Sequence, residues 1–257
     1  MNRSPLLLAL LFCAPAAWSH GKSCSVSSDY DLRITDQALL FEEEDGERSI
    51  RLADGSVSVD GRVLDLSRAD EARVRRFEAG VRELVPEVKA IAIDAVHLAS
   101  DALKAVSAGL STDADTIERV SARADQISAE LTAQIRSANS SHDFREHEFE
   151  DAVEDLIGEL VPELVGSITS LAVKAALSGD TSAVEAIERR ANELERTIER
   201  EVEQRAELIE DRADALCERV RALDEIESSF DFRLPDGSVL DLLDAPRSER
   251  RTIVAID

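Results

Sequence analysis

The sequence predicts a mostly helical α+β fold with a small antiparallel sheet. Short alternating segments separated by Asp-Gly pairs occupy residues 20–66 and predict a β meander. Apolar residues at helical spacing, with few glycines and prolines, predict helices throughout 67–227. A further Asp-Gly segment within 228–257 predicts a C-terminal hairpin and tail, and the simplest arrangement adds this hairpin to the N-terminal sheet.

The N-terminal segment has the pattern of a secretory signal peptide. Arg3 is followed by an apolar run from Leu6 to Ala14 and by small residues up to Ser19. We therefore predict a signal peptide over 1–19, cleaved after about Ser19, and an exported protein. The apolar run is too short to span a bilayer, and we expect no later membrane span because polar and charged residues interrupt the apolar segments.

The cysteines suggest a disulfide. Removal of the signal peptide takes Cys13 away and leaves Cys24 and Cys217 in an oxidising compartment, where we predict that they pair. The alternative is two free thiols. Neither cysteine lies in a Cys-x-x-Cys motif, so we do not expect a redox enzyme.

The N-terminal elements follow from turn and capping residues. Asp-Gly pairs at 45–46, 54–55 and 60–61 lie between short alternating segments, and both residue types tolerate the positive φ angles of tight turns. Ser67 followed by Asp70 forms a capping box, which predicts the start of the first long helix.

The helical region contains an internal repeat. The sequence Glu-Leu-Val-Pro-Glu occurs around Pro86 and again around Pro162, and each copy leads into an alanine-rich apolar run and then a charged helix. We interpret this as a duplication, with helical repeats at 67–140 and 141–227. We expect both prolines to kink their helices and the two apolar helices to pack together as the core.

A long charged helix is predicted near the C-terminal end of the second repeat. Apolar residues from Val184 to Leu223 recur at alternating steps of three and four, except for successive steps of four at Ile198. This coiled-coil-like helix needs a partner. The sequence leaves two candidates, the helix from Thr116 to Ile135 or an identical helix in a second chain, so the oligomeric state stays open.

The acidic net charge of the chain excludes some classes of binding partner. Asp and Glu number 54 against 30 Lys and Arg, and the formal net charge is -24. Such a chain repels phosphates and anionic lipid head groups, so we expect neither nucleic-acid binding nor electrostatic membrane docking.

One cluster has the residue types of a metal site. Asp143, His147 and Asp151 are spaced four residues apart and would share a helical face, and His142 lies beside them. Carboxylate and imidazole at that spacing can hold a divalent metal. The alternative is a solvated hinge between the two repeats, and we favour it because the spacing matches no strict metal motif.

Two other histidines are weaker candidates. Cleavage after Ser19 would leave His20 at the amino terminus, where amine and imidazole together can chelate copper. Asp94, His97, Asp101 and Lys104 form a polar stripe along the first apolar helix, either an ion relay or, as we expect, its exposed face. The sequence has no nucleophile elbow and no phosphate-binding glycine loop, so we expect no catalytic residues and no cofactor.

The order of several motifs resembles a known family. Cys24, then "DYDLRIT", "LADGSVSVDGRVLDLS", "VRELVPEVKAIAIDAVHLASDAL" and a late "LC" at 216–217 are similar to the YggN-type family of uncharacterised bacterial periplasmic proteins, whose domain has no known function. The resemblance covers nearly the whole mature chain. It implies a periplasmic location, supports the Cys24–Cys217 disulfide and supplies no catalytic residues to carry over.

We therefore expect a non-enzymatic protein-interaction, scaffold or chaperone-like protein that binds an envelope protein or an unfolded client. One alternative is lipid or acyl-chain binding between the apolar helices. Another is a metal-dependent enzyme that uses the cluster at 142–151.

Overall fold

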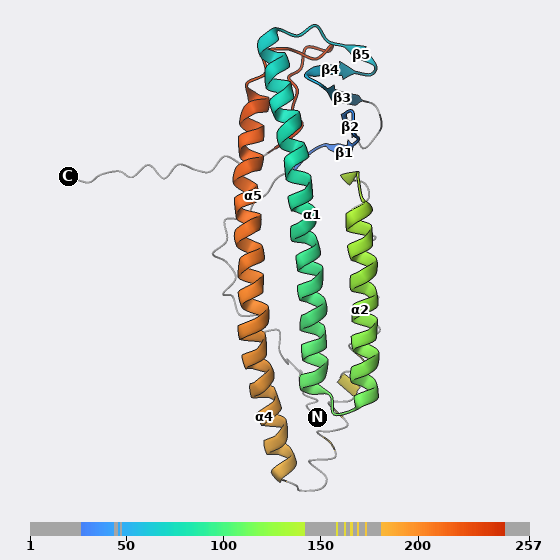
Figure 1. Ribbon diagram of the computed structural model, residues 1–257, viewed down its shortest axis with the longest axis vertical. Helices are drawn as coiled ribbons and strands as arrows, with labels where there is room; N and C mark the ends of the chain where they lie inside the picture. Colours follow the sequence, from blue (N-terminus) through green and yellow to red (C-terminus); the bar gives the residue numbers. More distant parts are fainter. Residues whose placement is uncertain are drawn as a thin grey trace, which may run out of the picture.

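The computed structural model confirms the α+β class. It describes residues 27–43, 46, 48–141, 158, 162, 165–166, 169, 173 and 181–244. Three helical columns lie side by side, and a small sheet covers one end of them (Figure 1). The central column is α1, with α2 on one side and the continuous column of α4 and α5 on the other (Figure 1).

The sheet is the predicted antiparallel meander. Its strands occur in chain order and comprise β1 (Tyr30–Ile34), β2 (Leu39–Glu43), β3 (Ser49–Ala53), β4 (Ser56–Val59) and β5 (Arg62–Val63). The turns between β3 and β4 and between β4 and β5 are the predicted Asp-Gly pairs. All four turn residues have positive φ, from 49° at Asp54 and Asp60 to 80° at Gly55.

One face of the sheet packs on α1 (Arg68–Leu110) and carries the hydrophobic core of the described residues. Cross-strand pairs such as Phe41 with Ile50 and Leu52 with Val57 align apolar side chains on that face. They contact the apolar side chains of the first turns of α1, including the fully buried Phe77. Among the described residues, bulky buried side chains concentrate at the sheet. The predicted packing of the two apolar helices stays a prediction, because most of the second helix lies outside the described residues.

The helix α1 begins as the capping box predicts. The Ser67 hydroxyl accepts a hydrogen bond from the Asp70 backbone N–H at 3.1 Å and donates one to the Asp70 carboxylate at 2.8 Å. Pro86 lies inside the helix without ending it, and the helix continues to Leu110. At 1.5 Å per residue its 43 residues extend about 64 Å, well past the sheet.

The helix α2 (Ala114–Ser137) folds back along α1 after a short turn. Its end is tied to the sheet, because the Ile34 N–H of β1 donates to the Asn139 carbonyl at 2.8 Å and the Leu32 N–H donates to the Ser141 hydroxyl at 2.8 Å. The residues that follow α2 therefore cover the outer edge of β1, which would otherwise present unpaired backbone groups.

The predicted long charged helix is present as α4 (Thr181–Thr197), a π-helical turn η2 (Ile198–Glu203) and α5 (Gln204–Ser228). The π-helical turn starts at Ile198, where the sequence departs from alternating steps. This helix packs along α1 over its length, and not on the helix from Thr116 to Ile135 as the first alternative had it. Pairing with a second chain stays a prediction.

Charges of opposite sign match α1 and α5 in one antiparallel register. Three ion pairs join residues spaced seven apart on each helix: Glu87 with Arg219, Asp94 with Arg212, and Asp101 with Arg205. We call this set the charge ladder. It explains the choice of partner, because α1 supplies acidic residues at the intervals at which α5 supplies arginines.

Two glycines of α1 lie where leucines of the α4–α5 column pack against it. A Cβ atom at Gly80 would lie 2.5 Å from a Leu223 methyl group, and one at Gly109 would lie 3.0 Å from Leu194. The α4–α5 column therefore approaches α1 closely at these two points. The two glycines and the charge ladder favour the same antiparallel pairing of α1 with the α4–α5 column.

The C-terminal segment from Ser229 to Asp244 differs from the predicted hairpin. The tight turn is present, with Gly237 at φ 89°, but among the described residues the flanking segments form no strand of the sheet. One isolated bridge joins Ser27 to Asp244. The segment instead packs the side chains of Leu234, Leu240 and Leu242 into the core.

Several predictions fall outside the described residues. These are the signal peptide 1–19, Cys24, the cluster at 142–151 and most of the second proline-containing helix around Pro162. The duplication and the proposed domain boundaries therefore stay predictions.

Candidate functional site

The best candidate site is a polar groove between α1 and α2, which we call the α1/α2 groove. Its volume is about 510 Å³. From α1 it is lined by His97, Ser100, Asp101 and Lys104, which include most of the predicted polar stripe. Antiparallel α2 supplies the facing side, and Arg205 reaches it from the start of α5.

One end of the groove is a charged cluster. The Lys104 ammonium lies 3.1 Å from the Asp101 carboxylate and 2.7 Å from that of Asp125 on α2, and Arg205 contacts Asp101 at 2.8 Å. Hydrogen bonds from Arg205 and Lys104 lower the pKa of Asp101, although partial burial opposes them. The carboxylates of Asp125 and Asp101 raise the pKa of Lys104. The Asp101 carboxylate and the Lys104 ammonium are therefore held in their charged forms at neutral pH.

The polar stripe is neither a solvent-only face nor a continuous relay. The His97 ring nitrogen Nε2 lies 3.3 Å from the Thr132 hydroxyl of α2. Asp94 faces the other way and pairs with Arg212 of α5, whereas Asp101 pairs with Arg205 and Lys104. The stripe thus divides between the two helices that flank α1.

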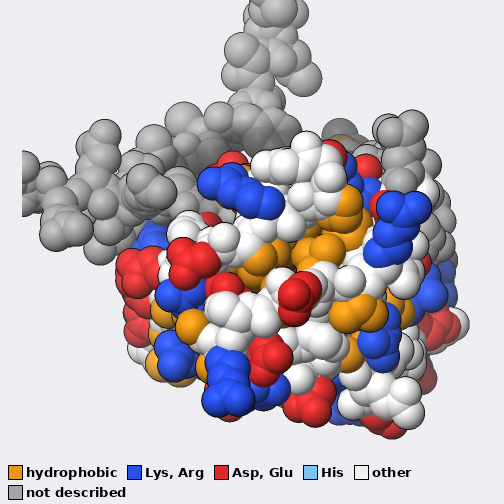
Figure 2. Space-filling view, turned by 90° about the horizontal axis from the view of Figure 1, so that it is seen from above, with side chains coloured by type: hydrophobic (Ala, Val, Ile, Leu, Met, Phe, Trp, Pro, Cys, Tyr) orange, Lys and Arg blue, Asp and Glu red, His pale blue; other side chains and the backbone are white. Residues whose placement is uncertain are grey.

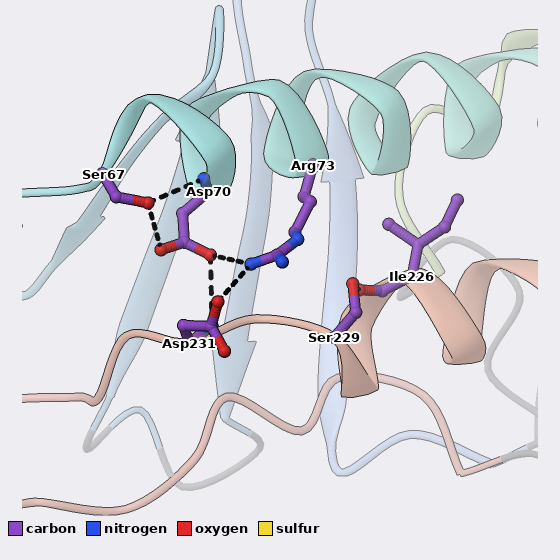
Figure 3. A network of polar contacts seen from close by, with 6 residues as sticks. All are labelled: Ser67, Asp70, Arg73, Ile226, Ser229 and Asp231. Atoms are coloured by element: carbon purple, nitrogen blue, oxygen red, sulfur yellow. Dashed lines mark hydrogen bonds and ion pairs between the residues drawn. The ribbon is translucent and has the colours of Figure 1, made fainter.

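A second polar network joins α1 to the C-terminal segment (Figure 3). The Asp70 carboxylate accepts hydrogen bonds from the Ser67 hydroxyl, the Arg73 guanidinium at 2.8 Å and the Asp231 backbone N–H at 3.1 Å. Arg73 also contacts the Asp231 carboxylate at 2.7 Å. Burial alone would raise the pKa of Asp70, but these hydrogen bonds outweigh it and hold the pKa below its ordinary value. The network fastens the chain after α5 to the start of α1.

Glu227 fastens the same segment further along. Its side chain is only 3% exposed, and its carboxylate accepts hydrogen bonds from the backbone N–H groups of Leu242 and Leu243. Burial raises the pKa of Glu227 to about 8, although the two backbone donors lower it. A carboxyl with a raised pKa is a common mark of catalysis. Here its oxygens are occupied by backbone donors, so its evident role is to anchor the segment.

The surface at the sheet end has a mixed character (Figure 2). Apolar side chains gather near the middle of that face and basic and acidic side chains surround them. The exposed apolar residues of this end include Val63 on β5 and Val239 beyond the C-terminal turn. Isolated exposed valines are normal on soluble proteins, so this face ranks below the groove as a site.

The predicted metal residues and the amino-terminal histidine cannot be placed. His142, Asp143, His147, Asp151 and His20 all lie outside the described residues. Within the described part of the chain, no group of three or more His, Cys, Asp or Glu side chains has the arrangement of a metal site.

Most residues that line the α1/α2 groove were not predicted from the sequence. Ser100, Asp125, Thr132, Arg136 and Arg205 were not singled out, because Ser, Asp, Thr and Arg recur throughout these helices. One signal was available for α2. The short connection after α1 folds α2 back, so residues at similar distances from the turn face each other.

The architecture defines a small antiparallel sheet fused to long helices, with a polar groove along the helices. The chain belongs to the family described as "Protein of unknown function (DUF2884)", whose model matches residues 24–243. No curated protein and no solved structure matches the chain. Among the described helices, none is long and apolar enough to cross a membrane.

Proposed function

We propose that this protein is exported to the periplasm and binds another protein through its helices, as a scaffold or chaperone-like factor rather than an enzyme. The partner class is an envelope protein or an unfolded client. The signal-peptide pattern at 1–19 and the resemblance to the YggN-type family support the location.

The observation that carries the proposal is the shape of the helices beyond the sheet. We call residues 88–137 and 181–216 the helical arm, and residues 27–87, 138–141 and 217–244 the sheet end. α1 extends far past the sheet, and its flanking helices lie on either side of it (Figure 1). In the described part of the chain, the arm therefore has long helical faces that are not packed into the hydrophobic core.

The arm also exposes apolar side chains. Leu208 on α5 is 63% exposed and Val88 on α1 is 44% exposed. Single exposed leucines are common, but Leu208 lies on a helix that is otherwise rich in charge. A partner that binds this face would cover Leu208 and meet acidic side chains around it, so we expect a partner with a basic, partly apolar surface.

Site-specific photocrosslinking in intact cells tests partner binding. A photoreactive residue at Leu208 probes the arm, and one at Val63, which is 73% exposed on β5, is the matched control. We expect a defined protein to be captured from position 208 and not from position 63. Failure of position 208 to capture any protein, together with failure of the purified protein to suppress aggregation of an unfolded client, would contradict the proposal.

Export and the disulfide have a direct test. We expect the cell-derived protein to begin at His20 and its non-reduced peptides to contain a Cys24–Cys217 link. Cys217 on α5 is only 8% exposed, as befits a disulfide cysteine, while Cys24 lies outside the described residues. An unprocessed N-terminus, or alkylation of both thiols in protein from cells, would count against this part of the proposal.

The two alternatives gain no specific support. The lipid alternative places an acyl chain between the two apolar helices, and most of the second of these lies outside the described residues. The metal hypothesis depends on the cluster at 142–151, which lies outside the described residues.

A further inference from the structure

One helical face between residues 158 and 173 is exposed and uncharged. Its described residues are all helical and all exposed, and we call them the glycine–valine face: Gly158, Pro162, Val165, Gly166, Thr169 and Val173. Steps of three and four residues separate them, apart from the adjacent pair at 165 and 166, so they line one side of a helix. None of the six is charged, although 33% of the chain is charged.

The two valines of this face stand out to solvent. Val165 is 53% exposed and Val173 is 49% exposed. A single exposed valine is ordinary on a soluble protein, but these two lie about two turns apart on one uncharged stripe. A contiguous apolar stripe of this kind is typical of a surface that a partner covers.

The two glycines of this face lack a packing partner within the described part of the chain. Glycine inside a helix is less stable than alanine by about 1 kcal/mol, so we look for a contact that requires it. At Gly80 and Gly109 of α1, leucines of the α4–α5 column supply that contact. A Cβ atom at Gly158 or Gly166 would meet no described atom within 4 Å, and neither glycine is among those with positive φ. Both positions are therefore shallow depressions that can receive a side chain from another molecule.

The order of the glycines and valines makes this face complementary to itself. Gly158 and Val173 lie equally far from the midpoint between residues 165 and 166. A two-fold axis through that midpoint, with the two helices antiparallel, sets Val165 beside Gly166 of the partner subunit. The same axis sets Val173 beside Gly158 of the partner subunit. Each valine then packs on a glycine, as the leucines of the α4–α5 column pack on the glycines of α1.

We propose that the glycine–valine face is the contact between two copies of this chain, paired antiparallel about this axis. A second copy fits because one face carries both the protruding valines and the glycines that receive them. The contact extends over about 22 Å of helix, and the formal net charge of -24 on each chain opposes it. We therefore expect a weak dimer, with a dissociation constant on the order of 10 µM. This surface does not depend on the proposed envelope partner.

Sedimentation equilibrium of the protein purified from cells tests the pairing at low salt and in about 0.5 M NaCl. We expect a monomer–dimer equilibrium that shifts toward the dimer at the higher salt concentration. Salt screens the repulsion between the two acidic chains and does not weaken an apolar contact. A protein that stays monomeric at roughly 100 µM, or a dimer that dissociates as salt is added, overturns the proposal.

One substitution fills a depression of the face. Gly166→Leu is expected to raise the dissociation constant at least about tenfold, because the added side chain occupies the space of the partner's valine. The matched control is Ala215→Leu, which adds the same side chain at an exposed position of α5 and should leave the dissociation constant unchanged. Thermal unfolding confirms that both variants fold. Equal dissociation constants in the wild type and Gly166→Leu would refute the proposed contact.

Two cysteine variants test the antiparallel register. In the proposed dimer the two copies of position 165 lie about 1.5 Å apart along the helix, and the two copies of position 173 lie about 22 Å apart. Mild oxidation should therefore link Val165→Cys into a covalent dimer and leave Val173→Cys unlinked, because a disulfide needs Cα atoms within about 7 Å. The wild type, treated in the same way, controls for the native cysteines. No linked dimer from Val165→Cys, or equal linking at both positions, would refute this arrangement.

Discussion

The sheet end and the helical arm are stabilised in different ways. At the sheet end, large apolar side chains from β2, β3, β4, α1, α5 and the C-terminal segment form one buried cluster, and apolar side chains of β1 pack against it. In the described arm, the buried apolar residues are Leu98, Val120, Ala124 and Ile135, and the buried hydroxyl residues are Ser100, Ser107, Ser111, Thr116 and Thr132. The ion pairs Asp94–Arg212 and Asp101–Arg205 of the charge ladder and the close approach of Leu194 to Gly109 connect its helices.

This difference assigns separate roles to the two regions. Burial of apolar surface is the main source of stability, so the sheet end holds the fold together. Exposed ion pairs add little stability, but they select one register and one partner. The arm can therefore bind a partner without disturbing the core, which is why we place the proposed partner-binding site on it.

The largest expected effect is in the core. Phe77 is fully buried and packs edge-on against Phe230, with ring centroids 6.1 Å apart. Phe77→Ala is expected to lower the free energy of unfolding by about 3 to 5 kcal/mol. Leu208→Ala in the arm is expected to change stability by less than about 0.5 kcal/mol. Urea unfolding compares the two variants. Similar losses would remove the distinction between core and arm.

The next effect concerns pH at the sheet end. The folded pKa of Glu227, about 8, lies above its unfolded value of 4.5, so the folded state holds the proton more tightly. The contribution to the free energy of unfolding is therefore fully present below pH 4.5 and is lost as pH rises through about 8. We expect a decline on the order of 2 to 4 kcal/mol across this window.

Glu227→Gln should flatten this dependence, because glutamine does not titrate and still accepts a backbone hydrogen bond. The matched control is Glu225→Gln, an exposed glutamate on the same helix, which should leave the slope unchanged. Chemical denaturation at several pH values between 5 and 8.5 measures how the free energy of unfolding depends on pH. A wild-type stability that rises over this range would contradict the role given to Glu227.

A smaller effect separates two turns of the sheet. Gly55 and Gly61 both have positive φ, but a Cβ atom at Gly55 would lie 2.7 Å from the Glu71 carbonyl oxygen, whereas one at Gly61 meets no atom within 4 Å. Gly61→Ala should cost about 1 kcal/mol from backbone strain alone. Gly55→Ala should cost about 2 to 3 kcal/mol, because α1 cannot move away from the turn. Equal changes in melting temperature in the two variants would show that the turn at Gly55 is not in close contact with α1.

The smallest effect is expected in the charge ladder. Asp94→Arg and Arg212→Asp should each destabilise the protein by less than about 1 kcal/mol, and the double variant should recover most of the loss. A double-mutant cycle measures the coupling. Because exposed charges are screened, the coupling should shrink in 1 M NaCl. If Asp94 and Arg212 show no coupling at low salt, the register of α1 against α5 would be set by the contacts at Gly80 and Gly109 and not by the charge ladder.

Much of the local structure could be predicted from neighbouring residues. The pairs Asp54-Gly55 and Asp60-Gly61 form the predicted tight turns, and Ser67 with Asp70 begins α1 as expected. The irregular spacing at Ile198 coincides with the π-helical turn. Of the candidate site, the sequence predicted only the polar stripe on α1.

The contacts between distant segments could not be predicted in this way. Glu227 accepts hydrogen bonds from Leu242 and Leu243, and Asp70 accepts one from Asp231. These carboxylates engage the backbone N–H groups that a strand would have used, so the C-terminal segment packs as a chain without joining the sheet. Its alternating sequence indicated a strand because local pattern carries no information about acceptors on α1 and α5.

The sequence by itself determined the helices, the meander turns, the acidic charge and the predicted signal peptide, because each depends on composition or on residues close together in the chain. Only the tertiary structure decided that α1 is the partner of α5 and that Ser100 and Arg136 line one groove. Acidic residues and arginines are abundant along all the helices, so many registers satisfy the local pattern. The packing of Gly80 against Leu223 and Gly109 against Leu194, together with the charge ladder, favours the observed one.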